Sequence, residues 1–276
     1  MRIAILADIH GNLPAFEAVL RHVRQQGVDQ VIIAGDLVNG APDSIECWQL
    51  AQTVPCVLLR GNHERYVFDF GLPHAPAVWQ TERFAPVHWT VAQFSTAERR
   101  QLSELPFAVR PPAAPDLLIV HASLRRDNDL IAAYTPEAEL AAMFPDSPEN
   151  YIVRGHEHWC QMRLWGERTI ITTGSVGWTL DENQATAQYL ILEQRANRWS
   201  IQHQAVAYDI HLTVQRFHTT GYLQATGPMG RLMLREIATA SSQIVPFLHA
   251  YERWLLAEPQ KELSLAEGIE RFFRLY

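Results

Sequence analysis

The sequence is poor in lysine, which limits the partners that its surface can attract. Lys261 is the single lysine among 23 basic residues, so the other 22 are arginine. The 30 acidic residues outnumber the basic ones and give a net charge of −7. A chain with that balance repels polyanions. We therefore expect no general nucleic-acid binding.

Cysteine and long apolar runs are also scarce. Cys47, Cys56 and Cys160 are too few and too scattered for a disulfide framework or a cysteine-based zinc finger. No apolar run reaches the about 18 residues of a membrane span. The run Ile3–Ala7 stops at Asp8 and is too short for the apolar core of a signal peptide. The expectation is a cytoplasmic protein with reduced thiols and no membrane contact.

The first half of the chain alternates short apolar runs with amphipathic stretches. The runs 3–7, 31–34 and 54–59 predict buried strands. Helices are predicted between them, one after the N-cap residue Asn12 and one over 44–53. Strands that alternate with helices predict right-handed crossovers and a parallel or mixed sheet with helices outside.

The second half predicts a different organisation. Further strands are expected at 117–120 and 151–154. Four later segments are rich in β-branched or alternating residues, which favours an antiparallel arrangement. They are 161–165, 169–173, 187–193 and 198–207. The tail changes again, because 230–256 and 262–275 are helical in composition.

Five short polar motifs follow predicted strands. They are Asp8-Ile9-His10-Gly11-Asn12, Gly35-Asp36, Gly61-Asn62-His63-Glu64, His121-Ala122-Ser123 and Gly155-His156-Glu157-His158. Ligands bind at strand ends in open α/β sheets. The alternation of a strand would put Asp8 beside His10, and His156 beside His158. The motifs supply more donors than the about three protein ligands of one catalytic metal, which favours two metals that share a ligand.

This series of motifs resembles that of the calcineurin-like metallophosphoesterases. The stretches Asp8–Leu13 and Gly35–Val38 resemble the bacterial phosphodiesterase branch in particular, and Gly174-Ser175-Val176-Gly177 is similar to a turn of that branch. The resemblance covers roughly residues 1–206. It implies an α/β fold, an αββα sandwich of two mixed β-sheets flanked by helices. We expect a catalytic domain over 1–209 and a helical C-terminal extension over 210–276 packed on it.

The resemblance also implies two divalent metal ions and a role for each donor. Asp8, His10 and His158 would hold the first ion. Asn62, His121 and His156 would hold the second, and Asp36 would bridge the two. A metal-bridging hydroxide would attack phosphorus, with His63 as the general acid for the leaving oxygen. Four imidazoles favour Mn, Fe, Zn, Co or Ni over Mg or Ca.

One departure bears on the substrate. Protein phosphatases of this superfamily usually carry G-D-x-x-D-R-G, where this chain has Gly35-Asp36-Leu37-Val38-Asn39-Gly40. Asn39 replaces the acid that would orient His63, and Gly40 replaces a phosphate-binding arginine. Glu64 and Asp69 are the candidate substitutes for the missing acid. This pattern favours a phosphodiesterase over a serine/threonine protein phosphatase-like phosphomonoesterase.

Other activities stay open at this point. A dinucleoside polyphosphate hydrolase is the rival within the superfamily. A non-catalytic scaffold is disfavoured, because all seven expected ligands and His63 are present. The expected partner is a small phosphoester, with nucleotides among the candidates, and the oligomeric state is left open.

The candidate substrate-binding residues are Asn12, Arg125 and Arg126. An arginine can bind a phosphate through two hydrogen bonds, although a solvated basic loop is an equal alternative for the pair. Trp79, Trp89 and Trp159 could stack on a base, but packing is the commoner fate of tryptophan.

Overall fold

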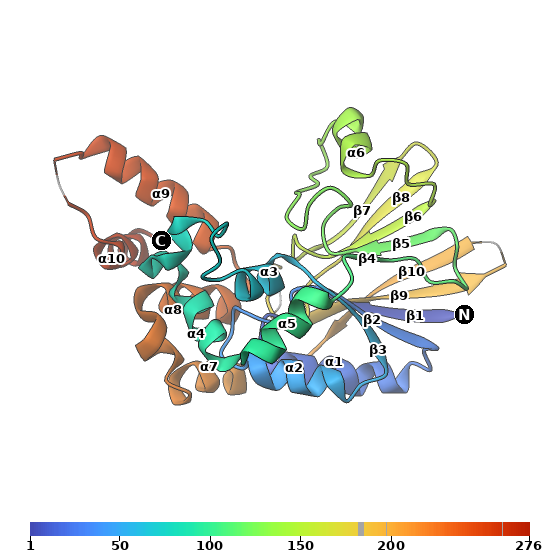
Figure 1. The fold of residues 1–276 in the computed structure, drawn as a ribbon, viewed down its shortest axis with the longest axis horizontal. Coiled ribbons are helices and arrows are strands. Elements are labelled where there is room, and N and C mark those ends of the chain that lie inside the picture. Colours follow the sequence, from blue (N-terminus) through green and yellow to red (C-terminus); the bar gives the residue numbers. More distant parts are fainter. Residues whose placement is uncertain (182–184, 197, 261) are drawn as a thin grey trace.

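The computed structural model describes residues 1–181, 185–196, 198–260 and 262–276. Two five-stranded β-sheets pack face to face, with helices on their outer faces (Figure 1). The α/β sandwich that the sequence resemblance implied is thus confirmed. Among the described residues, no helix combines the length and hydropathy needed to cross a bilayer.

The first sheet has the strand order β10-β9-β1-β2-β3. Its strands are β1 (Arg2–Leu6), β2 (Gln30–Ala34), β3 (Cys56–Leu59), β9 (Ala187–Arg195) and β10 (Arg198–Val206). The central strands β1, β2 and β3 are parallel, because helices α1 (Leu13–Gln25) and α2 (Ser44–Gln52) carry the chain back between them. Asn12 caps α1 as expected, with its side chain accepting from the Ala15 N–H.

The second sheet has the order β4-β5-β6-β8-β7. Its strands are β4 (Ala108–Val109), β5 (Leu117–Val120), β6 (Tyr151–Arg154), β7 (Cys160–Trp165) and β8 (Arg168–Thr173). Strands β5, β6 and β8 are parallel to one another, and the edge strands are antiparallel. Helix α6 (Glu137–Met143) covers the outer face of this sheet.

The expected antiparallel second half is only partly present. Strands β7 and β8 form an antiparallel pair, as do β9 and β10. The two pairs lie in different sheets, however, and β8 runs parallel to β6. Strand β9 crosses to the first sheet and pairs antiparallel with β1. Periodicity identifies strands but cannot tell which sheet a strand will join.

The alternation along β1 explains why this strand is apolar throughout. Ile3 and Ile5 point into the layer between the sheets, and both are fully buried. Ala4 and Leu6 point to the opposite face, against the cluster that includes Phe16 of α1. A strand covered on both faces has no polar side, as is usual in parallel sheets with helices outside.

A helical segment follows β3 and leads away from the sandwich. It contains α3 (Asn62–Phe68), two 3₁₀ turns (Ala77–Gln80 and Glu82–Phe84), α4 (Ala85–Gln93) and α5 (Thr96–Glu104). Helix α3 begins within the Gly61-Asn62-His63-Glu64 motif, so the chain turns helical directly at the end of β3.

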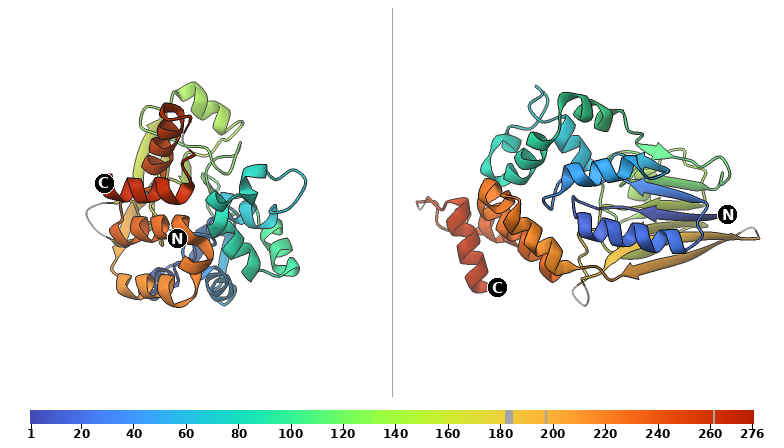
Figure 2. Two further views of the ribbon diagram at one scale, coloured as in Figure 1. Left: turned by 90° about the vertical axis from the view of Figure 1, so that its left-hand side faces the viewer. Right: turned by 90° about the horizontal axis from the view of Figure 1, so that it is seen from below.

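The described residues of the tail form four helices at the end of the sandwich opposite the N-terminus (Figure 2). They are α7 (Ile210–Thr219), α8 (Tyr222–Thr239), α9 (Ile244–Ala257) and α10 (Leu265–Leu275). The expected helical stretch 230–256 is interrupted after α8, because Ala240 adopts a left-handed conformation with φ 49°. Helix α8 is also kinked at Gly227, just before Pro228.

The tail helices share a core with the rest of the chain. Phe217, Tyr222 and Met233 form one buried cluster with Ala41 and Trp178. The division into a domain of residues 1–209 and an extension of residues 210–276 stays a prediction.

Candidate metal centre

Side chains from five strand ends meet at one edge of the sandwich. Their donor atoms form three groups, in each of which all the atoms lie within 4.8 Å of one another. The groups are Asp8 with His10 and His158, His10 with Asp36 and His63, and Asp36 with His121 and His156. The structure thus brings together the seven residues expected as ligands, with Asn62 Oδ1 at 3.1 Å from His121 Nε2.

The residues do not meet through strand alternation, as the sequence suggested. Strand β1 ends at Leu6, and both Asp8 and His10 lie beyond it with φ values of 57° and 51°. His156 and His158 also have positive φ, and they fall in different groups rather than side by side. The alternation argument was therefore wrong, although the residues that it selected do converge.

Left-handed backbone is concentrated in this centre. Asp36 has a φ of 54°, so five of the seven expected ligands are in a region that non-glycine residues rarely adopt. Such conformations persist where the surrounding structure imposes them, and they gather at functional sites. Here they turn the short loops after β1, β2 and β6 so that their side chains point toward the same centre.

The Gly174–Gly177 turn supports the first of these loops. The Gly177 N–H donates to the Asp8 carbonyl, and the Val176 N–H donates to the Ala7 carbonyl. A side chain at Gly177 would collide with the Ile9 carbonyl, so only glycine fits there. The turn therefore holds the backbone on both sides of Asp8.

Backbone carbonyls fix two of the histidine rings. His10 Nδ1 lies 2.8 Å from the Asn39 carbonyl, and His121 Nδ1 lies 2.9 Å from the Ala34 carbonyl. Each ring donates its Nδ1–H outward, which leaves the Nε2 lone pair facing the centre. This is how proteins orient histidines that bind metals.

The inward nitrogens come close to one another and to carboxylates. His10 Nε2 lies 3.0 Å from His158 Nε2, an approach that needs a proton or a cation between the two. Asp36 Oδ2 lies 3.2 Å from His121 Nε2 and 3.7 Å from His10 Nε2. Asp36 is thus the carboxylate shared between groups.

Burial dominates the electrostatics of the centre. It raises the pKa of Asp8 to about 8, although His121 opposes the rise. Burial would also raise the pKa of Asp36, but the neighbouring His121 and His63 hold it well below its usual value. The pKa of His10 falls well below its usual value through burial and the neighbouring His63. The pKa of His121 is instead raised to about 9, because Asp36 outweighs its burial. A divalent cation requires the deprotonated form of each of these groups, so metal binding would release protons here.

Glu64 ties two of the loops together. Its carboxylate accepts backbone N–H groups from Asp36 at 2.8 Å, Leu37 at 2.8 Å, Val38 at 3.2 Å and Gly61 at 2.6 Å. The side chain is fully buried. Glu64 is therefore engaged with the backbone and is not the substitute acid for His63 that the sequence left open.

Asn39, rather than an acid, contacts His63. His63 Nδ1 lies 3.0 Å from the Asn39 carbonyl and 2.7 Å from the Asn39 side-chain amide. Asp69, the other candidate substitute, lies 3.1 Å from His74 Nε2 instead. His63 Nε2 is 4.0 Å from Asp36 Oδ2, and the His63 side chain is 17% exposed, so it borders the centre and can be reached from outside.

A comparison with known proteins identifies the family. Residues 1–160 match the model of the calcineurin-like phosphoesterases, which is more than half of the 276 residues. The chain belongs to the calcineurin-like phosphoesterase family. The resemblance seen in the motifs is thereby confirmed at the level of the superfamily.

Individual relatives of this calcineurin-like phosphoesterase are distant. A segment of 109 residues is 27% identical to the uncharacterized protein MJ0912 of Methanocaldococcus jannaschii, covering 39% of this chain and 43% of that protein. The match therefore spans less than half of that relative.

Two solved structures are similar over most of the chain. A metallophosphoesterase from Sphaerobacter thermophilus has 25% identity and a TM-score of 0.69, covering 87% of this chain and 99% of that one. The hypothetical protein PH1004 from Pyrococcus horikoshii OT3 has 18% identity and a TM-score of 0.67, covering 84% and 97%. The second likeness concerns the fold alone.

The candidate substrate-binding residues of this phosphoesterase have hydrogen-bond or ion-pair partners within the fold. Asn12 is fully buried, and besides capping α1 it donates to the Gly177 carbonyl and accepts from Thr213. All of its hydrogen-bonding capacity is used within the fold, so its placement does not support substrate contact.

Arg125 and Arg126 are exposed on the loop after β5. Arg125 is engaged by Asp129 and Glu139, with N–O distances of 2.9 and 2.8 Å. The backbone N–H of Arg126 donates to Ser123 Oγ, and the Arg126 carbonyl accepts from the Ser123 N–H. Arg125 therefore has acidic neighbours where a substrate phosphate was expected, and substrate contact by either arginine stays a prediction.

Two aromatic residues beside His63 were missed by sequence reasoning. The Tyr66 ring centroid is 5.1 Å from that of His63, and the Trp178 centroid is 6.4 Å from it. Of the tryptophans considered from the sequence, Trp79 is buried, Trp89 donates to the Pro42 carbonyl, and Trp159 is exposed. In the sequence, only the position of Trp178 directly after the Gly174–Gly177 turn indicated that it lies near the site.

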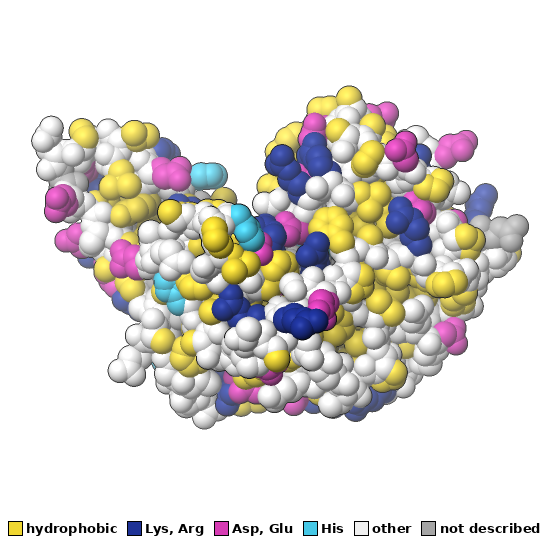
Figure 3. Space-filling model, in the orientation of Figure 1, with side chains coloured by type: hydrophobic (Ala, Val, Ile, Leu, Met, Phe, Trp, Pro, Cys, Tyr) yellow, Lys and Arg dark blue, Asp and Glu magenta, His cyan; other side chains and the backbone are white. Residues whose placement is uncertain are grey.

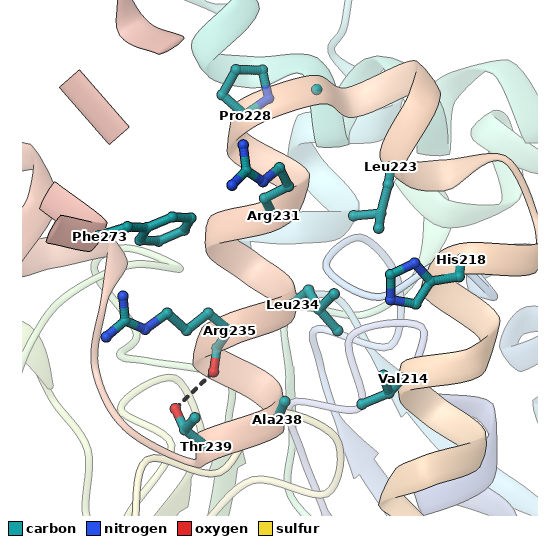
Figure 4. A pocket seen from close by; sticks show the side chains of 11 residues that line it. Val214, His218, Leu223, Pro228, Arg231, Leu234, Arg235, Ala238, Thr239 and Phe273 are labelled. Carbon is teal, nitrogen blue, oxygen red and sulfur yellow. Dashed lines mark hydrogen bonds between the residues drawn. The ribbon is translucent and has the colours of Figure 1, made fainter. Parts of the chain in front are cut away.

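The molecule is hollowed away from the candidate metal centre. Figure 3 shows a deep notch between the projecting tail helices and the lobe around α6. A separate cavity of about 790 Å³ lies among α7, α8 and α10, lined by side chains such as Leu223, Leu234 and Phe273 (Figure 4). Its residues do not include any member of the metal centre.

Proposed function

We propose that this protein is a two-metal phosphodiesterase of the bacterial phosphodiesterase-like branch that acts on small phosphoesters. The observation that carries the proposal is the set of three donor groups, linked to one another through His10 and Asp36, with His63 in the middle group. Family membership supports phosphoester chemistry, and the geometry supports the finer assignment.

The donors suit two divalent cations. Asp8, His10 and His158 would hold one ion, and Asn62, His121 and His156 the other, with Asp36 shared between them. When bound, two such ions supply Lewis-acid stabilisation of the phosphoryl oxygens and an activated water. The number of imidazoles favours Mn, Fe, Zn, Co or Ni over Mg or Ca.

His63 supplies the proton for the leaving oxygen. Its Nδ1 lies beside the Asn39 carbonyl and side-chain amide, so the proton available for transfer from the imidazolium is the one on Nε2, on the side of Asp36. Burial lowers the pKa of His63 although Asp36 opposes this, which makes the imidazolium a stronger acid. After the transfer, the partly exposed ring can regain its proton from solvent.

The surroundings of Gly40 favour diesters over monoesters. A Cβ at Gly40 would lie 2.9 Å from His10 Cβ and 3.1 Å from Trp178 Cε3, and its φ is 149°. The arginine that protein phosphatases carry at this point therefore has no room. A diester carries one negative charge fewer than a monoester dianion and needs less cationic contact beyond the two metals.

A substrate panel tests the proposal. The protein is loaded with Mn²⁺ and given an aryl phosphodiester, an aryl phosphomonoester, a cyclic nucleotide, a dinucleoside polyphosphate and a phosphoserine peptide. We expect the highest kcat/KM on diesters. Preference for the phosphopeptide would make the protein phosphatase the better assignment, and preference for the polyphosphate would favour the P–O–P hydrolase. Metal binding without any hydrolysis would favour the scaffold.

A further inference from the structure

Trp178 packs directly on the metal-site histidines. Its ring centroid lies 4.8 Å from that of His10, 5.5 Å from that of His158 and 6.4 Å from that of His63. The indole is 5% exposed, so it forms an inner wall rather than a surface. Any tilt of this ring would change the space available to two expected ligands of the same metal.

A single carboxylate from the tail holds that indole. Glu236 on α8 accepts the Trp178 Nε1–H at 3.0 Å. Its other oxygen accepts the backbone N–H of Gln243 at 2.6 Å and that of Ile244, the first residue of α9. Glu236 is 4% exposed, and three donors meet on it. A buried indole N–H without this acceptor would carry the cost of an unsatisfied donor.

The opposite side of α8 has a different character. Arg231, Leu234, Arg235 and Ala238 point toward the cavity between the tail helices (Figure 4). The face with Met233, Glu236 and Ile237 is buried against the rest of the chain. Glu236 is therefore the polar group through which α8 contacts Trp178.

We propose that Glu236 is a positioning residue for the metal centre and acts through Trp178. It fixes the indole against His10 and His158 and, with its second oxygen, fixes the start of α9. The C-terminal helices thus help to shape the first metal site, although they contribute no ligand. The inference rests on the two-metal assignment of the proposed function.

A double-mutant cycle on Mn²⁺ affinity tests this role. The variants are Glu236→Gln, Trp178→Phe and the double variant, in the full-length protein. Glutamine has one acceptor oxygen, so it cannot serve both the indole and the start of α9, and phenylalanine keeps a ring but has no N–H. We expect each single variant to weaken the first-site Kd roughly fivefold to tenfold, below the ~10–100-fold cost of losing a direct partner of a metal ligand.

The coupling between the two substitutions shows whether Glu236 positions the indole or only stabilises the fold. The Kd of the double variant should equal that of whichever single variant binds Mn²⁺ less tightly. The effects should not multiply, because both changes break the same Trp178–Glu236 contact. Glu270→Gln on α10 is the control, since that exposed carboxylate pairs with Arg231 and does not touch Trp178. It should leave the Kd unchanged.

Two outcomes would overturn the inference. One is a Glu236→Gln variant with a lower Tm but wild-type Mn²⁺ affinity, which would make the residue purely structural. The other is a double variant whose losses multiply, which would make the two residues independent. A wild-type protein that binds Mn²⁺ but hydrolyses no phosphodiester would refute the proposed function and leave this comparison valid.

Discussion

One backbone carbonyl serves two residues with different tasks. The Asn39 carbonyl lies 2.8 Å from His10 Nδ1 and 3.0 Å from His63 Nδ1. Both rings therefore present Nε2 to the centre, one as an expected ligand and one as the proposed acid. Where protein phosphatases use a carboxylate, this chain uses a neutral acceptor, which orients the acid without adding a charge.

At the residue scale, His63→Ala should separate metal binding from proton transfer. We expect both metals to remain bound and kcat to fall by about 10²–10⁴, the usual contribution of a positioned acid. The loss should shrink for a nitrophenolate leaving group, which scarcely needs a proton. Steady-state kinetics on an alkyl and an aryl diester, with metal analysis of both proteins, provide the check. A variant that loses metal would show that His63 is a ligand.

The shared position of Asp36 leads to a second prediction at this scale. Asp36 belongs to two donor groups and Asp8 to one. Asp36→Asn should therefore weaken both metal sites, whereas Asp8→Asn should weaken only one. Titration calorimetry with Mn²⁺ on each variant gives the two affinities. Equal effects of the two substitutions would contradict a bridging role.

At the scale of elements, the centre depends on how loops are joined. Strand ends deliver the residues, but the tight turns after β1 and β6 aim them, with left-handed backbone at positions such as Asp8 and His158. The Glu64 carboxylate then joins the loop after β2 to the start of α3. These contacts fix the loop after β2 and the start of α3, which are far apart in sequence, relative to each other.

Glu64→Gln should loosen this junction. An amide offers one acceptor oxygen for four backbone N–H groups, so buried donors lose their partner. We expect a loss of about 2–4 kcal/mol in the free energy of unfolding, measured by urea denaturation. Glu98→Gln is the matched control, because Glu98 caps α5 in an exposed position and should cost about 1 kcal/mol or less. Equal losses in the two variants would contradict the junction role.

The sequence allowed much of this arrangement to be predicted, but not all of it. Polar motifs after apolar runs located the centre, because strand ends are identifiable from periodicity. The separation of His156 from His158 was expected from the family resemblance but not from strand alternation, since it depends on positive φ at non-glycine residues. The capping role of Asn12 was predictable, because it depends on neighbouring residues. Its hydrogen bonds to Gly177 and Thr213 were not, because those residues are distant in the sequence.

At the scale of the whole molecule, the tail is built into the wall of the sandwich. Tyr222 of α8 donates to the Gly40 carbonyl, and Arg216 of α7 pairs with Asp43, with Arg216 Nε 2.9 Å from Asp43 Oδ1. Thr213 donates to Asn12, at the start of α1. The tail therefore contacts the loop after β2 and the first helix, close to the proposed active site.

A fragment of residues 1–209 should consequently fail to fold as the intact protein does. It would expose Ala41 and Trp178, which are now covered by Phe217 and Tyr222. We expect weak near-ultraviolet circular dichroism and rapid proteolysis, compared with the full chain under the same conditions. A fragment with a cooperative melting transition and wild-type Mn²⁺ affinity would show instead that the first 209 residues form an independent domain.

The crowding around Gly40 constrains how this chain could evolve. The space beside Gly40 is filled by His10 and by the Trp178 ring. A side chain at position 40 would meet His10 Cβ as well as Trp178 Cε3, so a smaller residue at 178 alone would not make room for it. Trp178 is in turn held by Glu236. The effect of an arginine at position 40 therefore depends on residues from distant parts of the gene, and single substitutions toward the protein-phosphatase motif are not independent of them.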